Sequence, residues 1–269
     1  MNNEFEKLSR PIANSSGFPL QIRIAEIVGS SSIWRVLLEE HPWASAETQS
    51  EGFIDIIIEG RDPVDFQAMV IECKRVRQTS WVFLIPKPSP NERTHARLWH
   101  SRHNYKKWNN FGWEDRQTEP KSYESKFCAI QGQEGGRKTL LERTASELVN
   151  SIESLAYQEK ELEERRFQED PTNYQHWFQR VYIPVIVTTA KLIVARFDPS
   201  SISLVDGSLP SNAVFNTVPY VRFRKSLSSS VAYSFQQTLQ DVHKQTERTV
   251  FVVNAEGFHD FIENWEITD

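Results

Sequence analysis

Cysteine is scarce in this sequence of 269 residues, and long apolar runs are missing. Two cysteines, Cys73 and Cys128, are too few for a disulfide framework or for a zinc site built from cysteines. No stretch approaches the roughly 20 apolar residues that a membrane-spanning helix needs. The opening residues, MNNEFEKLSRPIANSS, are polar and include acids, unlike a secretory signal. These absences favour a cytoplasmic protein with no membrane partner.

An excess of positive charge is also missing, because the formal net charge is −5 and the sequence pI is near 5.9. A protein that coats nucleic acid would be basic overall. The charge is unevenly spread, however: bases outnumber acids between Lys74 and Lys138, whereas residues 142–170 are acidic. Because an enzyme that releases its product needs only a local basic cleft, nucleic acid remains a candidate substrate.

The hydrophobic and charged fractions, 39% and 25%, are those of a folded globular chain. Apolar spacing predicts a helix over residues 18–40 that bends near Gly29, and a long helix over residues 137–166. Residues 52–60 and 66–76 are predicted to form two strands of an antiparallel hairpin. Further strands are predicted at residues 126–132, 181–189, 191–198, 218–225 and 248–254, with a short helix at 258–265.

The segment from Ser89 to Glu124 has no apolar periodicity and is rich in basic and aromatic residues, so we expect a long loop there, either functional or mobile. The order of elements predicts an α/β fold, with a mixed β-sheet flanked by helices, in a single domain over residues 1–269.

The two strands of the predicted hairpin carry acids and a lysine. Asp55 lies on the first strand, and Glu72 and Lys74 lie on the second. Since alternate side chains of a strand share a face, Glu72 and Lys74 point the same way and Cys73 points to the opposite face. Two acids can hold Mg²⁺ through oxygen and leave positions for water and a phosphate. A lysine beside them can hold or deprotonate the attacking water, or stabilise the transition state.

This arrangement, GFIDIII followed by VIECKR, resembles the signature of the PD-(D/E)XK, or restriction-endonuclease-like, nucleases. Ile54 stands where the family name has proline. The similarity extends over the order of elements from about Phe18 to about Phe197. It implies a restriction-endonuclease-like fold that cuts phosphodiester bonds in DNA with Mg²⁺, or with Mn²⁺ in its place, in bacterial antiviral defence, restriction or repair. It also implies catalysis by Asp55, Glu72 and Lys74, and a metal held by Asp55, Glu72 and a glutamate of the first helix, Glu26.

Basic residues near this motif are candidates for binding the nucleic acid backbone. Arg75 and Arg77 follow the motif directly, and the basic aromatic segment can combine charge with stacking of bases. That segment can equally be a subunit interface, or an insertion that packs against the rest of the domain. The predicted nucleic-acid contacts are Arg75, Arg77, Arg102, Lys106 and Lys107.

Two other function classes remain open at this stage. A module without catalysis could use the same fold to bind nucleic acid or protein, although it would have no reason to keep both acids and the lysine. RNA is an alternative substrate, since nothing in the sequence separates it from DNA. Cutting both strands of a duplex usually requires two active sites, so a homo-oligomer or an accessory protein is an expected partner.

Overall fold

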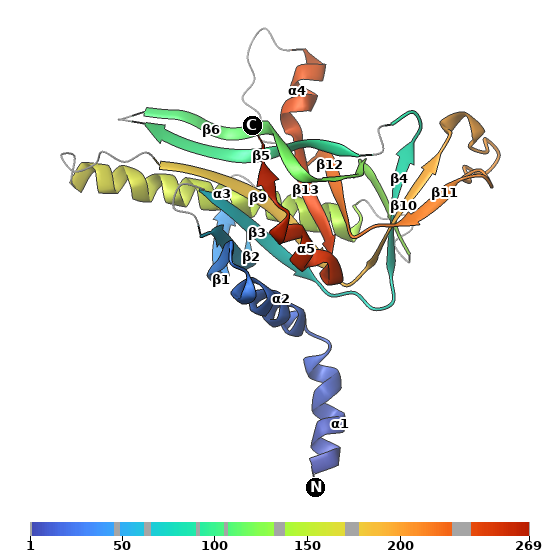
Figure 1. Ribbon diagram of the computed structural model, residues 1–269, viewed down its shortest axis with the longest axis horizontal. Helices are drawn as coiled ribbons and strands as arrows, with labels where there is room; N and C mark the ends of the chain where they lie inside the picture. Colours follow the sequence, from blue (N-terminus) through green and yellow to red (C-terminus); the bar gives the residue numbers. More distant parts are fainter. Residues whose placement is uncertain are drawn as a thin grey trace.

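The protein has a mixed α/β architecture in which helices flank a large mixed sheet (Figure 1). The computed structural model describes residues 2–45, 49–61, 66–89, 92–104, 107–131, 138–169, 178–227 and 238–268. Within these ranges the helices are α1 (Asn2–Ala13), α2 (Phe18–Ser30), α3 (Leu140–Glu169), α4 (Leu239–Thr246), α5 (Phe258–Glu263), and the short 3-10 turns η1 (Pro199–Ser201) and η2 (Ala255–Gly257). The strands are β1 (Trp34–Ser45), β2 (Ser50–Gly60), β3 (Gln67–Lys74), β4 (Ser80–Pro86), β5 (Arg93–Asn104), β6 (Lys107–Ser122), β7 (Glu124–Ser125), β8 (Phe127–Ile130), β9 (Phe178–Thr188), β10 (Lys191–Phe197), β11 (Val214–Thr217), β12 (Tyr220–Ser226), β13 (Glu247–Asn254) and β14 (Glu266–Ile267).

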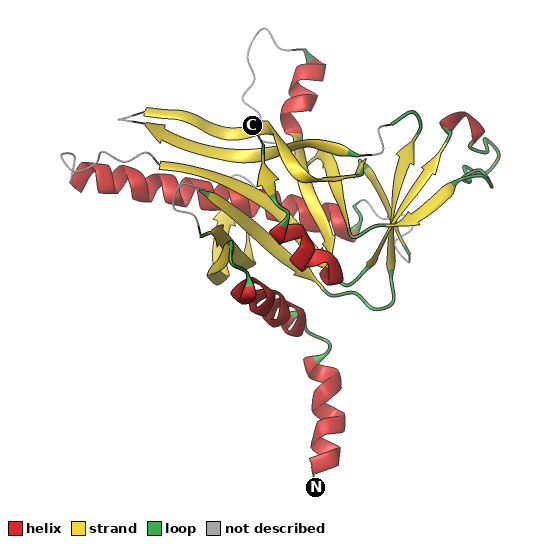
Figure 2. Cartoon of the chain, in the orientation of Figure 1, coloured by secondary structure: helices red, strands yellow, loops and turns green. Residues whose placement is uncertain are grey.

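The main sheet runs in the order β1-β2-β3-β9-β13-β12-β7, with β5, β6 and β14 attached beside β9. One face packs against the buried side of α3, and the other packs against α2 and α5 (Figure 2). A second sheet has the order β11-β10-β4-β8 and contacts the first where β4 meets β7 and β10 meets β13. The core of the protein therefore lies on both faces of the main sheet.

Strands β1, β2 and β3 form an antiparallel meander, and β9 then pairs with β3 in parallel. The predicted hairpin of β2 and β3 is confirmed, with Ile56 paired to Ile71 and Ile58 to Met69. Both strands are buried on both faces, which explains their nearly continuous apolar sequences. The parallel step from β3 to β9 requires a crossover, and α3 supplies it.

The predicted strands at residues 126–132, 181–189, 191–198, 218–225 and 248–254 correspond to β8, β9, β10, β12 and β13, and the predicted short C-terminal helix corresponds to α5. The long helix is also confirmed. It begins at Leu140, where Thr139 and Glu142 exchange hydrogen bonds between side chain and backbone N–H.

The prediction of one bent helix over residues 18–40 was wrong. Helix α2 ends at Ser30, and residues from Trp34 onward form β1. Ser31 ends the helix, since its hydroxyl accepts hydrogen bonds from the N–H groups of Ile33 and Trp34. The apolar residues after Gly29 fit a helical spacing, but pairing with β2 determines their conformation.

The prediction of a loop between Ser89 and Glu124 was also wrong. Strands β5 and β6 form a long antiparallel hairpin, and β5 pairs in addition with β9. Trp99 contacts Trp113 and Phe111 edge to face, and Phe111 also contacts Tyr157 of α3. No alternation was visible in the sequence because large or basic side chains occupy both faces of this hairpin.

Helix α1 projects away from the sheet (Figure 1), and its apolar side chains Phe5, Leu8 and Ile12 are exposed. It therefore adds nothing to the core. In the part of the chain that the structure describes, no helix has both the length and the apolar character needed to cross a membrane.

Candidate active site

The β-meander brings the two predicted acids together. The register that pairs Ile56 with Ile71, continued by one residue, sets Asp55 of β2 opposite Glu72 of β3. One carboxylate oxygen of Asp55 accepts a hydrogen bond of 2.7 Å from the backbone N–H of Cys73. This bond fixes the Asp55 carboxylate against the end of β3, beyond the last backbone pairing of the two strands.

Lys74 lies on the same face of β3 as Glu72, as alternation along a strand requires. Its Nζ donates to Oε1 of Glu72 at 2.5 Å, and the two side chains are 28% and 19% exposed. Residues on the other face, including Cys73, pack into the core beneath α2. Cys73 is thus a buried thiol that points away from Glu72, and burial raises its pKa.

The electrostatics of the site disfavour having Asp55 and Glu72 ionised at the same time without a cation between them. Burial raises the pKa of Glu72 to about 7, and the charge of Asp55 adds to this effect although Lys74 opposes it. Burial also raises the pKa of Asp55, against the Cys73 hydrogen bond and the charge of Lys74. Burial alone would lower the pKa of Lys74, but the surrounding acids outweigh it and raise this pKa. Lys74 therefore keeps its proton at neutral pH.

These residues fit a divalent cation such as Mg²⁺. Two carboxylates whose pKa values are raised by burial and mutual repulsion gain from a positive ion between them. Within the described ranges, no three His, Cys, Asp or Glu side chains gather as a complete metal site. Mg²⁺ does not need one, since it usually binds through one or two carboxylates and keeps several waters.

Three further polar residues approach the site, and the sequence reasoning missed all of them. Gln21 of α2, only 6% exposed, donates from Nε2 to the backbone oxygen of Asp55 at 3.0 Å and to Glu40 Oε1 at 2.6 Å. Glu40 of β1 raises the pKa of Asp55, and Glu147 of α3 raises that of Glu72. The one signal for Gln21 was an amide next to the buried stripe of α2. Glu40 was missed because its segment was assigned to a helix.

Replacing Gln21 with alanine is expected to lower the free energy of unfolding by about 1–3 kcal/mol, because the buried carbonyl of Asp55 and the Glu40 carboxylate lose a donor. Urea denaturation measures this change. The matched control is Gln158→Ala, which removes an exposed amide bonded to Ser154 and His41. Equal losses in the two variants would show that Gln21 does not support the site.

Glu26 does not join the two acids. Its side chain is 69% exposed and forms an ion pair with Arg23 at 2.5 Å. It lies on the part of α2 that faces His259 and η2, whereas the buried face of α2 carries Leu20, Gln21, Ile24 and Val28. The glutamate expected from the first helix is therefore not near the acids; Gln21 approaches them instead.

The predicted nucleic-acid contacts do not all lie near the acids. Arg75 and Arg77 lie on the loop that follows Lys74 directly. Arg102 of β5 pairs with Gln179 of β9, whereas Lys74 pairs with Thr188, so roughly 30 Å of strand separates them. The structure therefore does not bring Arg102 to the acids. Lys106 lies outside the described residues, and only the backbone of Lys107 is described.

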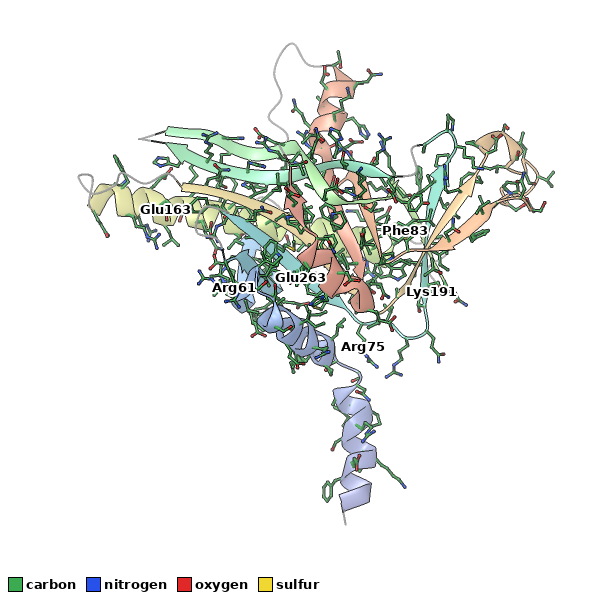
Figure 3. All side chains as sticks on the ribbon, in the orientation of Figure 1. Arg61, Arg75, Phe83, Glu163, Lys191 and Glu263 are labelled. Carbon is green, nitrogen blue, oxygen red and sulfur yellow. The ribbon has the colours of Figure 1, made fainter. Side chains whose placement is uncertain are left out.

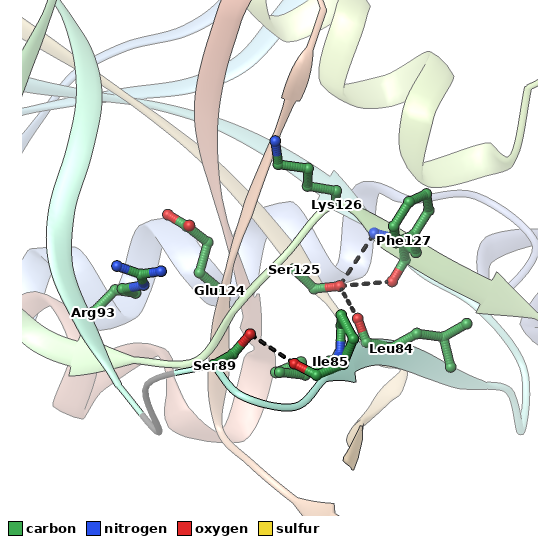
Figure 4. Close-up of a pocket in the computed structure, with 9 residues that line it drawn as sticks. Leu84, Ile85, Ser89, Arg93, Glu124, Ser125, Lys126 and Phe127 are labelled. Carbon is green, nitrogen blue, oxygen red and sulfur yellow. Dashed lines mark hydrogen bonds between the residues drawn. The ribbon is translucent and has the colours of Figure 1, made fainter. Parts of the chain in front are cut away.

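A separate hollow of about 180 Å³ lies where the two sheets meet, between β4 and β7 (Figure 4). Its polar lining includes Arg93, Glu124 and Ser125. Burial raises the pKa of Glu124 in spite of the arginines around it. Ser125 Oγ donates to the backbone oxygen of Leu84 and so ties the sheets together. None of the predicted catalytic residues lines this hollow, and its bonds are those of a structural joint.

Comparisons with models of known protein families, with curated proteins and with solved structures found no match for this chain.

Proposed function

We propose that this protein is a Mg²⁺-dependent nuclease that hydrolyses phosphodiester bonds in DNA. The observation that carries the proposal is the meeting of Asp55, Glu72 and Lys74 in one half-buried site on two paired strands. Burying two acids and an amine together is costly, and a site that binds a cation and a phosphate accounts for that cost.

The order of elements around this site supports the resemblance to the PD-(D/E)XK nucleases. Helix α2 precedes the meander of β1, β2 and β3, and α3 leads to β9, which lies parallel to β3. The acids stand on the second and third strands of this unit. A restriction-endonuclease-like core is therefore the finer fold assignment that we propose.

Asp55 and Glu72 would hold the metal, which when bound would neutralise charge on the phosphate and lower the pKa of a water. Lys74 has a raised pKa and stays protonated. Of the roles open to a lysine here, a protonated amine can hold the oxygen of the attacking water or stabilise negative charge on the transition state. It cannot remove a proton from water. The proton acceptor is thus not Lys74 in this proposal.

The test is a digestion assay with purified protein, plasmid DNA or RNA, and Mg²⁺. We expect DNA cleavage that stops on addition of EDTA and that falls at least a hundredfold in Asp55→Asn. Glu26→Gln is the control, and from its exposed position we expect less than a twofold effect. Absence of cleavage by the unmodified chain, or full activity of Asp55→Asn, would refute the proposal. If the protein cleaved RNA but not DNA, the proposed substrate would change from DNA to RNA.

A further inference from the structure

A hollow of about 560 Å³ opens at the carboxyl ends of β9 and β13. We call it the carboxyl-edge pocket. Its lining combines apolar side chains with groups that form hydrogen bonds, and it contains one lysine, Lys191, and one acid, Glu256; the other residues that matter here are Thr189, Leu192, Thr217, Val218 and Pro219. The carboxyl ends of parallel strands are where open α/β sheets commonly bind ligands.

The walls of this pocket are held by specific contacts. Asn254, at the end of β13, donates from its side chain to the backbone oxygen of Ala190 at 2.8 Å and accepts from the N–H of Glu256 at 3.0 Å. Gly257 allows η2 to approach Pro219, directly before β12, because a Cβ at this position would lie 2.9 Å from Cβ of Pro219. The hollow is therefore part of the fixed architecture.

The pocket adjoins the candidate active site. Lys74 pairs with Thr188 on β9, and the next residue, Thr189, donates its N–H to the backbone oxygen of Lys74 at 3.3 Å. The Thr189 hydroxyl also bonds both backbone groups of Val76, at 2.8 Å and 2.9 Å. One turn thus lines the pocket and holds the chain that leaves Lys74.

Three cations stand along this edge of the sheet. Arg75 and Arg77 lie on the loop after β3, and the N–H of Lys191 bonds the backbone oxygen of Thr79 at the end of that loop. Figure 3 labels both Arg75 and Lys191, with Lys191 higher and further to the right in its view. None of the three has an ion-pair partner among the residues that the structure describes, whereas Lys74 is paired with Glu72. Cations without an ion-pair partner beside the proposed phosphodiesterase site are suited to binding the phosphates of a nucleic acid.

We propose that the carboxyl-edge pocket binds a nucleotide of the substrate strand beside the phosphate that is cut. Lys191 contacts the phosphate of that nucleotide, and its base lies against Val218 and Pro219. The inference rests on the proposed nuclease function, since the active site supplies the reason for a nucleic acid to lie here. The added claim is that the protein binds one base in the carboxyl-edge pocket, away from the catalytic residues. The nucleotide in the pocket must therefore be unpaired or displaced from its duplex.

The first test measures binding of a fluorescent single-stranded oligonucleotide in EDTA, so that no strand is cut. Lys191→Ala is expected to weaken binding three- to tenfold and to reduce the slope of log Kd against log salt by about 1, since one phosphate contact is lost. Lys87→Ala is the matched control: Lys87 is also exposed and follows β4, at the opposite end of the strand pair that Lys191 begins. Equal affinities of these two variants would overturn the proposal.

The second test asks whether a base enters the pocket. Thr217→Trp puts a large ring at its rim, and Val214→Trp puts the same ring at the other, exposed end of β11. We expect Thr217→Trp to weaken binding of the normal oligonucleotide about fivefold and to leave an abasic strand of equal length unaffected. Circular dichroism confirms that each variant is folded. Equal weakening for the normal and the abasic oligonucleotide would show that no base enters the pocket. The same conclusion would follow if Thr217→Trp and Val214→Trp bound equally well.

The same measurements separate failure of the pocket from failure of the nuclease. If the chain cuts DNA but Lys191→Ala binds and cuts like Lys87→Ala, the pocket assignment is wrong and the nuclease stands. If the chain never cuts DNA but oligonucleotide binding depends on Lys191 and Thr217 as described, the pocket stands and the catalytic proposal is wrong.

Discussion

Replacing Lys74 with alanine is expected to lower the rate of Mg²⁺-dependent DNA cleavage by about 10²–10³-fold. In the proposed mechanism the protonated amine would hold the attacking water or stabilise negative charge on the transition state, and loss of one such donor has a cost of this size. Single-turnover cleavage of plasmid DNA measures the chemical step directly. Calorimetric titration with Mg²⁺ is expected to show binding still present, because Asp55 and Glu72 remain.

The control for this prediction is Lys126→Ala. Lys126 also pairs with a glutamate, Glu247, at 2.9 Å, but on another part of the sheet. We expect its cleavage rate to stay within twofold of the unmodified chain. If Lys74→Ala cut as fast as Lys126→Ala, the lysine of the motif would have no part in the chemistry and the proposed mechanism would be wrong.

Replacing Glu72 with glutamine is expected to stabilise the folded protein at pH 8 while it removes activity. The folded-state pKa of Glu72 is raised from 4.5 to about 7. Between these values the folded chain keeps a proton that the unfolded chain has released, so the free energy of unfolding falls as the pH rises through this interval. A glutamine avoids that loss. The gain at pH 8 is of the order of 3 kcal/mol and vanishes near pH 4.

Urea denaturation at pH 4, 6 and 8 measures this difference, with Glu26→Gln as an exposed control whose stability is expected to stay the same. The effect of Mg²⁺ on the free energy of unfolding provides an independent test. At pH 8 the ion should stabilise the unmodified chain by binding its folded state, and should stabilise Glu72→Gln much less. A variant that is less stable than the unmodified chain at pH 8 would mean that Glu72 is a structural ion-pair partner of Lys74 rather than a strained acid.

The centre of the candidate site could be predicted from the sequence because its geometry is local. Alternation along one strand sets Glu72 and Lys74 on one face, and a hairpin with few intervening residues sets Asp55 near them. The long helix α3 was equally clear from its apolar periodicity, and the buried strand β9 from its nearly continuous run of β-branched residues. These features depend on residues close together in the chain.

The outer residues of the site could not be predicted because they depend on contacts between distant segments. Gln21 meets Asp55 only when α2 packs across β2, and Glu40 meets Gln21 only because residues 34–45 form a strand. The apolar spacing after Gly29 fits a helix as well as a strand, so tertiary pairing decided the outcome. The hairpin of β5 and β6 was hidden for a similar reason, since bulky side chains on both faces conceal the alternation.

Strands β3, β9 and β13 all end at the same border of the sheet, and short connections at residues 75–79, 189–190 and 255–257 carry the groups that surround the site. The paired strands beneath them form a frame held by backbone hydrogen bonds, and of the connecting residues Thr189 and Gly257 have structural roles of their own. Substitutions at the other connecting positions are therefore expected to alter which nucleic-acid strand the proposed nuclease binds, and how tightly, without disturbing the register that holds Asp55 and Glu72. Selection for binding to a different nucleic acid would therefore act first on the positions in these short connections.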